Sequence, residues 1–177
     1  MKKLLFTFIV LLTIPNNNAQ ESSLSFPDDF LGVYKGELRI TSLKGSQEIP
    51  MEFHLLKTDI KDKYHYKIVY DNTPRNYYLI IKDKEKGVFE IDEANGIVLP
   101  ANLNDNVLYS LFEVQGNFLT TRLDFRAREL LFEILFSKLA NKTTTGGIVN
   151  DRDSTNLVPK VYGFPISVFQ KAILKKQ

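Results

Sequence analysis

The sequence predicts an all-β protein, an antiparallel up-and-down β-barrel of about nine or ten strands. Over most of the chain, apolar residues recur at every second position between short groups of turn residues. This is the spacing of strands that bury one face. Long runs with helical spacing are absent. A meander with this many strands has two edges to protect, and closure into a barrel removes both.

The first four strands follow from alternating aromatic and aliphatic residues. Tyr34 and Leu38 mark one face of the first strand, Phe53 the second, Tyr66 the third and Tyr77 the fourth. The later strands follow from the same pattern. In chain order, the predicted strands cover residues 30–40, 49–55, 64–70, 77–81, 88–92, 97–103, 107–115, 118–125 and 130–137.

The stretch VFEIDEANGIVLPANL, residues 88–103, predicts a hairpin. A three-residue loop with Gly96 left-handed after a type I turn pairs Ile91 with Leu99 and keeps the apolar face intact. Successive strand residues point to opposite faces, so the neighbouring acids Asp92 and Glu93 separate. We expect Asp92 outside, and Glu93 at the barrel rim on the interior side.

The next two hairpins predict one consistent interior. A two-residue turn at Gly116 and Asn117 pairs Ser110 with Leu123, and a tight turn at residues 127–128 then pairs Leu123 with Phe132. On the outer face this register places opposite charges together, as in Arg122 with Glu133.

The end of the chain changes in character. Residues 138–157 are polar, rich in Thr, Asn and Gly, and lack a period, which predicts a flexible loop. Residues 158–177 fit either a helix or a strand. We favour a strand, because a last strand beside the first would close the barrel.

The chain begins with the pattern of a secretory signal peptide. Lys2 and Lys3 precede an apolar run over residues 4–14, and Ala19 ends a polar exit segment. That run is too short to span a bilayer. The predicted organisation is a signal peptide at residues 1–19, cleaved near Ala19, and a single barrel domain at residues 20–177. The exported protein is expected in the periplasm or the medium, without a transmembrane anchor.

Composition excludes several function classes. The formal net charge of +2 comes from the two leader lysines, so the expected mature chain is neutral and no nucleic-acid partner is indicated. The chain has no cysteine, which excludes disulfides, thiolate metal sites and a thiol nucleophile. An exported protein that folds without disulfides suits a bacterial origin. No cofactor is indicated, and the oligomeric state stays open.

The segment Ser25, Phe26, Pro27, Asp28 and Asp29, followed by Gly32-Val33-Tyr34, resembles the start of a calycin, the superfamily of lipocalin, fatty-acid-binding and nitrobindin-like barrels. In these proteins a Gly-x-Trp near the first strand closes one barrel end, and Tyr34 stands in the place of the tryptophan. The run IDEANGIVL is also similar to a group of uncharacterised secreted bacterial barrels. The resemblance implies a fold and a class of ligand.

The predicted interior provides the candidate binding site. An apolar cavity with a few hydroxyl groups suits a small hydrophobic or amphipathic ligand, whereas the same rings could also simply fill the barrel. The candidate ligand-binding residues are Tyr34, Phe53, Tyr64, Tyr66, Tyr70, Tyr77, Glu93, Ser110, Phe112, Thr121 and Phe132, with Phe125 and Phe136 on the same face.

His54 and His65 are the only histidines. The predicted second hairpin sets them opposite one another on the outer face, with Glu52 nearby, a weak candidate metal site. The absence of a histidine after residue 65 counts against the haem ligand that nitrobindin-like proteins supply near the C-terminus. No nucleophile elbow, phosphate-binding loop or metalloprotease motif occurs, so no catalytic residue is assigned.

Three functions stay open. The leading one is an exported barrel that binds a small lipophilic molecule non-covalently. The alternative is a cell-envelope interaction or structural module with a packed barrel and no small-molecule ligand. A weaker alternative is an enzyme that uses cavity tyrosines and a carboxylate. The first two differ in whether the barrel interior is hollow or filled.

Overall fold

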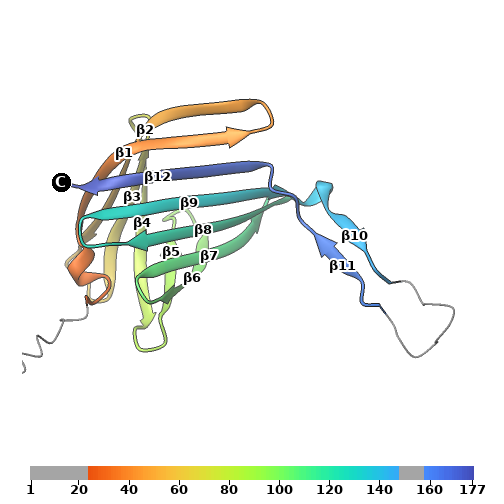
Figure 1. Cartoon of the computed structure of the whole chain (residues 1–177). Helices are drawn as coiled ribbons and strands as arrows, with labels where there is room; N and C mark the ends of the chain where they lie inside the picture. Colours follow the sequence, from red (N-terminus) through yellow and green to blue (C-terminus); the bar gives the residue numbers. More distant parts are fainter. Residues whose placement is uncertain (1–23, 148–157) are drawn as a thin grey trace, which may run out of the picture.

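A computed structural model describes residues 24–147 and 158–177, and ten of its strands form one closed antiparallel barrel (Figure 1). The predicted all-β, closed antiparallel barrel is confirmed. The barrel strands are β1 (Gly32–Ser42), β2 (Gly45–Lys57), β3 (Lys63–Tyr70), β4 (Thr73–Asp83), β5 (Val88–Asp92), β6 (Val98–Asn104), β7 (Val107–Val114), β8 (Asn117–Phe125), β9 (Glu129–Lys138) and β12 (Val168–Lys176). The predicted signal peptide lies outside the described residues.

The last strand closes the barrel. Strand β12 lies between β1 and β9, with Ala172 opposite Leu38 on one side and opposite Phe132 on the other. All other neighbours are consecutive in the chain. The prediction of a C-terminal strand beside the first is therefore confirmed, and its apolar residues Ala172 and Leu174 are buried.

The β5–β6 hairpin has the predicted register and a different loop conformation. Ile91 lies opposite Leu99, and the Glu93 amide donates to the Ile97 carbonyl over 2.9 Å. The predicted type I turn is wrong, because Ala94 already has a positive φ of 56°. The Asp92 carboxylate accepts a hydrogen bond from the Ala94 amide at 2.8 Å, which supports this unusual conformation.

The β7–β8 turn lies one residue earlier than predicted. Gln115 and Gly116 have φ of 49° and 74°, as in a type I′ hairpin turn, and Ser110 pairs with Thr121 instead of Leu123. The register thus differs by two residues, and each residue keeps its predicted face because side chains alternate with period two. Strands β8 and β9 have the predicted register, including Arg122 opposite Glu133.

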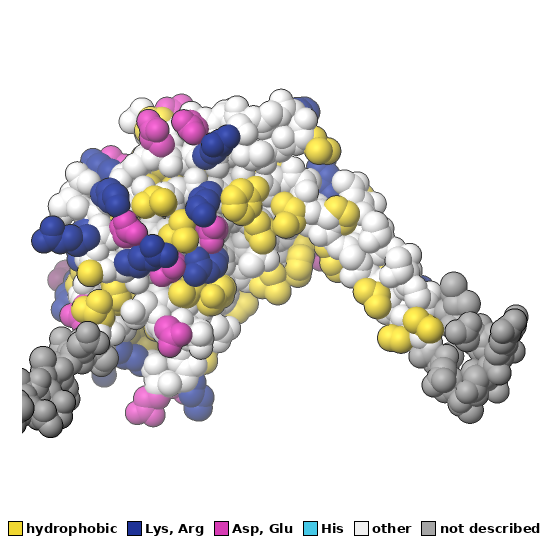
Figure 2. Space-filling model, in the orientation of Figure 1, with side chains coloured by type: hydrophobic (Ala, Val, Ile, Leu, Met, Phe, Trp, Pro, Cys, Tyr) yellow, Lys and Arg dark blue, Asp and Glu magenta, His cyan; other side chains and the backbone are white. Residues whose placement is uncertain are grey.

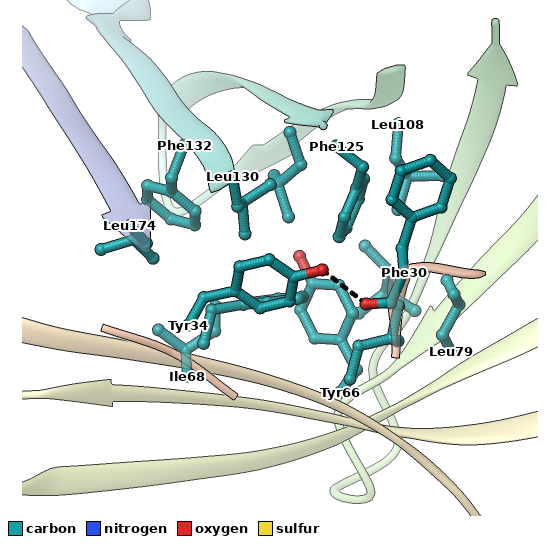
Figure 3. Packing of buried hydrophobic residues seen from close by; sticks show 14 of the residues in the cluster. Phe30, Tyr34, Tyr66, Ile68, Leu79, Leu108, Phe125, Leu130, Phe132 and Leu174 are labelled. Carbon is teal, nitrogen blue, oxygen red and sulfur yellow. Dashed lines mark hydrogen bonds between the residues drawn. The ribbon is translucent and has the colours of Figure 1, made fainter. Parts of the chain in front are cut away.

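One end of the barrel is closed by the segment that precedes β1. The short 3-10 helix η1 (Asp28–Phe30) carries Phe30 into the barrel, where its ring lies 5.8 Å from that of Phe125. Tyr34 is fully buried beside it, and its hydroxyl donates to the Phe30 carbonyl over 2.6 Å (Figure 3). Lys57, at the end of β2, and Lys84, just after β4, reach the Asp28 carboxylate at 3.5 Å each. We call this end the closed end.

The opposite end of the barrel is open. There the turns β1–β2, β3–β4, β5–β6 and β7–β8 end, and β9 leaves the barrel. Many inward-facing side chains in this half stay partly exposed, although Met51 and Ile68 are buried, whereas most of those near η1 are buried. The partly exposed group includes Ile40, Ile49, Tyr70, Tyr77, Leu99, Phe112, Leu119, Ile134 and Phe136. Solvent therefore enters the barrel interior through the open end and reaches only the half of the interior next to that end.

Between β9 and β12 the chain makes an excursion, which we call the arm (described residues 139–147 and 158–167). A 3-10 helix, η2 (Leu139–Asn141), leads into β10 (Thr143–Thr145), which pairs with β11 (Val161–Gly163) in a separate two-stranded sheet. The arm projects away from the open end (Figure 1). The prediction of an irregular loop over residues 138–157 is wrong for residues 143–145, which form a strand. Residues 148–157 lie outside the described residues.

Candidate functional site

The candidate site lies at the open end, on the inner wall of β3 and β4 and at the start of the β5–β6 loop. Four of the predicted residues, Tyr66, Tyr70, Tyr77 and Glu93, come together there with Arg75. Together these five residues form the tyrosine–arginine cluster. Tyr66 lies opposite Tyr77, and both face the interior. Tyr78 lies opposite Asp92, and both face outward. Because side chains alternate along a strand, Tyr70, Arg75 and Glu93 also face the interior.

The aromatic rings of the cluster define a surface on one side of the barrel. The Tyr66 and Tyr77 rings stack at 6.4 Å between centroids with 27° between their planes. The Arg75 guanidinium lies 5.9 Å from the centre of the Tyr70 ring, within the range of a cation–π contact. The side chain of Arg75 is therefore held over the wall of the barrel by its aromatic neighbours.

Burial and hydrogen bonding shift the pKa of three residues of the cluster. Burial raises the pKa of Tyr66 and of Tyr70, so both phenols stay neutral at physiological pH. A hydrogen bond to the Tyr77 side chain is the main cause that raises the pKa of Arg75, with smaller contributions from Tyr70 and Glu93. The site thus offers a fixed cation beside neutral hydroxyl groups.

The wall opposite the cluster is apolar. Phe112 on β7, Leu119 on β8, and Ile134 with Phe136 on β9 face inward and are partly exposed. Thr121 is half-buried on the same wall. The open half of the barrel therefore has a polar side and an apolar side, as an amphipathic molecule requires.

Several predicted site residues belong instead to the packed half. Tyr34 is fully buried and Phe132 almost fully (Figure 3). Phe53 is also fully buried, and its ring packs edge-on against Tyr66 at 4.8 Å between centroids. No surface of Tyr34 or Phe53 can be reached by water, so these rings fill the barrel and do not line a cavity. Of the two alternatives, a ligand cavity and rings that fill the barrel, the closed half fits the second, because Phe30 of η1 fills it.

The hydroxyl groups near the closed end also have protein partners. The Tyr64 hydroxyl donates to the Asp28 carboxylate at 3.3 Å, and the Ser110 hydroxyl donates to the Pro100 carbonyl at 2.6 Å. In the part of the chain that the structure describes, no fully buried side-chain nitrogen or oxygen lacks a hydrogen-bond partner. No ligand is needed to satisfy these groups.

The candidate metal ligands do not converge. The register places His54 opposite Lys67 and His65 opposite Leu56, two residues away from the predicted pairing. Glu52 binds both His54, at 2.8 Å, and Lys35, at 2.6 Å. Within residues 24–147 and 158–177, no group of three or more His, Asp or Glu side chains could hold a metal ion.

Sequence reasoning missed Arg75. It is two residues before Tyr77, so the alternation that places Tyr77 inside also places Arg75 inside. The fourth strand was predicted to begin at residue 77, whereas β4 begins at Thr73. An arginine on the apolar face of a strand was the signal that could have identified it.

The arrangement of the candidate site suits the non-covalent binding of a small molecule. It combines one cation, neutral hydroxyl groups and an apolar wall, and these groups can bind the polar end and the hydrocarbon part of a small molecule. No helix in the described part of the chain has the length and apolar character to cross a bilayer.

The chain matches no protein-family model and no curated protein. Among solved structures it is similar to the S-type phycobiliprotein lyase CPES from Guillardia theta, with a TM-score of 0.53 and 6% sequence identity. The similarity covers 85% of this chain and 89% of the lyase chain. At this identity the similarity shows a shared fold alone.

Proposed function

We propose that this protein binds a small amphipathic molecule non-covalently in the open half of its barrel. The tyrosine–arginine cluster binds the polar end, and the wall of Phe112 and Ile134 contacts the apolar part. The observation that supports this proposal most directly is an inward-facing arginine among tyrosines, opposite an apolar wall. Closed antiparallel barrels of this kind are common scaffolds for such ligands.

The cluster favours an anionic or acceptor-rich polar end. Arg75 presents donors only, and the neutral phenols of Tyr66 and Tyr70 can donate as well. The negative charge of Glu93 is near enough to add to the rise in the pKa of Arg75, while its carboxylate accepts a hydrogen bond from the Asn95 amide at 3.2 Å. Because the closed half is packed, the apolar part of the ligand must be short or extend out of the open end.

The proposal is tested with a matched pair of probes, a straight-chain fatty acid and the alcohol of the same length, titrated calorimetrically into the purified protein. We expect tighter binding of the acid. Arg75→Gln should weaken binding of the acid about tenfold to a hundredfold, because a hydrogen bond to a charged group contributes about 1.5–3 kcal/mol. Binding of the alcohol should change little.

Arg39→Gln is the matched control, since Arg39 lies exposed on the outer face of β1 and should affect neither probe. Phe112→Ala should weaken both probes alike. If Arg75→Gln binds the acid as tightly as wild type does, the proposed role of the cluster is contradicted. No binding of either probe, and no small molecule retained by the protein purified from its host, would favour the interaction module instead.

Export forms part of this proposal. Its support is the basic, then apolar, then polar pattern of residues 1–19. Mass spectrometry of the protein recovered from its host should give a chain that begins at Gln20. A full-length chain that starts at Met1 and stays inside the cell would contradict export, and it would leave the ligand proposal intact.

A further inference from the structure

We propose that the arm and the adjoining outer face of the barrel dock on the surface of a lipid bilayer that contains anionic lipids. This inference does not depend on ligand binding in the barrel. It rests on the apolar residues of the arm, on their charge environment, and on the distribution of polarity along the barrel.

The arm exposes apolar side chains on both of its faces. Tyr162 lies opposite Thr144 on one face, and Val161 lies opposite Thr145 on the other. Val161 is 53% exposed and Ile166, where the arm returns to the barrel, is 58% exposed. A two-stranded sheet with three residue pairs is marginal in water, so the arm gains stability from a surface that covers it.

The charge on the described part of the arm is positive. Lys142 and Lys160 place their ammonium groups 4.5 Å and 5.4 Å from the centre of the Tyr162 ring. Residues 139–147 and 158–167 include two lysines and no aspartate or glutamate, and the sequence from 139 to 167 as a whole holds three basic and two acidic residues, a formal charge of +1. An aromatic ring flanked by lysines is suited to a bilayer interface, where the ring enters the headgroup layer and the ammonium groups meet anionic phosphates.

The outer face of the barrel continues this apolar surface. Near the open end, Phe169, Leu135, Thr120 and Leu111 form one row across β12, β9, β8 and β7. The Phe118 ring packs 5.7 Å from the Phe164 ring, which joins the barrel to the arm. Figure 2 shows apolar side chains that extend from the barrel onto the arm.

Toward the closed end, charged residues predominate on the same face, with the apolar pair Ile173 and Leu131 between two charged rows. Lys171, Glu133 and Arg122 form one such row. Lys175, Glu129 and Arg126 form ion pairs further along. The charged part lies away from the arm (Figure 2). This polarity orients the open end toward an apolar environment and the closed end toward water.

A bilayer fits these features better than a second copy of the chain. A thin hairpin with apolar residues on both faces can bury both at once only by partial immersion. Two copies that met through this surface would bring Lys142 and Lys160 of each together. The hairpin has unpaired backbone edges, so it lies in the headgroup layer and not in the hydrocarbon core.

The experiment measures cosedimentation of the purified protein with vesicles of phosphatidylcholine alone and of phosphatidylcholine with phosphatidylglycerol. We expect stronger binding to the anionic vesicles, weakened by salt. Lys142→Gln with Lys160→Gln should reduce binding about 30-fold, since each lysine near an anionic surface contributes about a factor of five. Val161→Ser with Ile166→Ser should reduce binding about tenfold or more on both vesicle types.

Matched controls lie at the closed end. Ile60→Ser removes a side chain that is 62% exposed, and Lys61→Gln with Lys86→Gln removes two exposed charges. These variants should bind like wild type. Absence of binding to both vesicle types, or equal losses in arm and control variants, would overturn the proposal. A dimer in sedimentation velocity that the arm variants dissociate, without vesicle binding, would instead assign this surface to a second copy.

Discussion

Tyr34 connects the first strand to the segment that closes the barrel. Its ring packs in the core, and its hydroxyl binds the carbonyl of Phe30, the residue that fills the closed end. At the scale of single residues, the fold depends on side chains such as this one, which bury an apolar ring and give their one polar atom a hydrogen-bond partner.

We expect Tyr34→Phe to lower the free energy of unfolding by about 1–2 kcal/mol, because the Phe30 carbonyl loses its partner inside the protein. Urea unfolding followed by circular dichroism measures the change. Tyr162→Phe, on the exposed arm, should leave the stability unchanged. A loss below about 0.3 kcal/mol in Tyr34→Phe would mean that water replaces the hydroxyl group.

The tyrosines also predict how stability depends on alkaline pH. Burial raises the pKa of Tyr34 to about 12, and it raises the pKa of Tyr64 and Tyr66 as well. The neutral phenols stabilise the folded state fully below the unfolded-state pKa of about 10, and this contribution is lost as the pH rises toward 12. Stability should therefore fall with pH above about 10.

Unfolding in urea at increasing pH, with tyrosinate absorbance recorded in parallel, measures this dependence. Between about pH 10 and 12, Tyr34→Phe should lose less stability than wild type, because it lacks one phenol whose pKa is raised by burial. Identical slopes for the two proteins would contradict the assignment to Tyr34.

At the scale of elements, the contact between β1 and β12 converts a meander into a closed barrel. The two strands come close at Gly36, where a Cβ atom would lie 2.7 Å from the Ile173 carbonyl oxygen. Backbone atoms on both sides leave little room for adjustment. This glycine therefore permits a close approach of the two strands that no larger residue allows.

Gly36→Ala should destabilise the protein by about 1–3 kcal/mol, since the added methyl group forces β1 and β12 apart. Thermal unfolding measures the loss, and hydrogen exchange should show faster exchange along β1 and β12 than elsewhere. Glu37→Ala, the neighbouring exposed position, should cost little. An unchanged melting temperature in Gly36→Ala would show that the strands adjust without strain.

At the scale of the whole molecule, the barrel is one closed sheet and the arm carries a separate two-stranded sheet. Strand β12 pairs with two barrel strands, whereas β10 and β11 pair only with each other. Strand β12 and the β10–β11 hairpin are neighbours in sequence, but closure of the barrel depends only on β12.

A chain that stops at Ser167 lacks β12 and leaves β1 and β9 as open edges, so we expect it to aggregate and to lose cooperative unfolding. A chain in which a short Gly-Asn-Gly linker replaces residues 143–163 should keep a cooperative transition within a few degrees of wild type. Size-exclusion chromatography and calorimetry compare the two. Cooperative unfolding of the truncated chain would show that nine strands suffice.

The sequence by itself determined the strands and their faces. Alternation with period two identified the nine barrel strands before the arm, and turn residues placed the β5–β6 hairpin in its register. The same periodicity explains the errors, because a shift of two residues preserves every face. The β2–β3 and β7–β8 pairs were both misplaced by two residues.

Tertiary structure alone decided which part of the interior is filled and which residues meet. The side chains of Tyr34 and Tyr70 look alike in an alternating strand, yet η1 packs against the first and leaves the second near the open end. The Arg75 guanidinium lies near the Tyr70 ring across the β3–β4 hairpin, and the curved sheet brings Glu93, just after β5, near enough to add to the rise in the pKa of Arg75. Local pattern specifies the side of the sheet, whereas depth inside the barrel depends on what closes its ends.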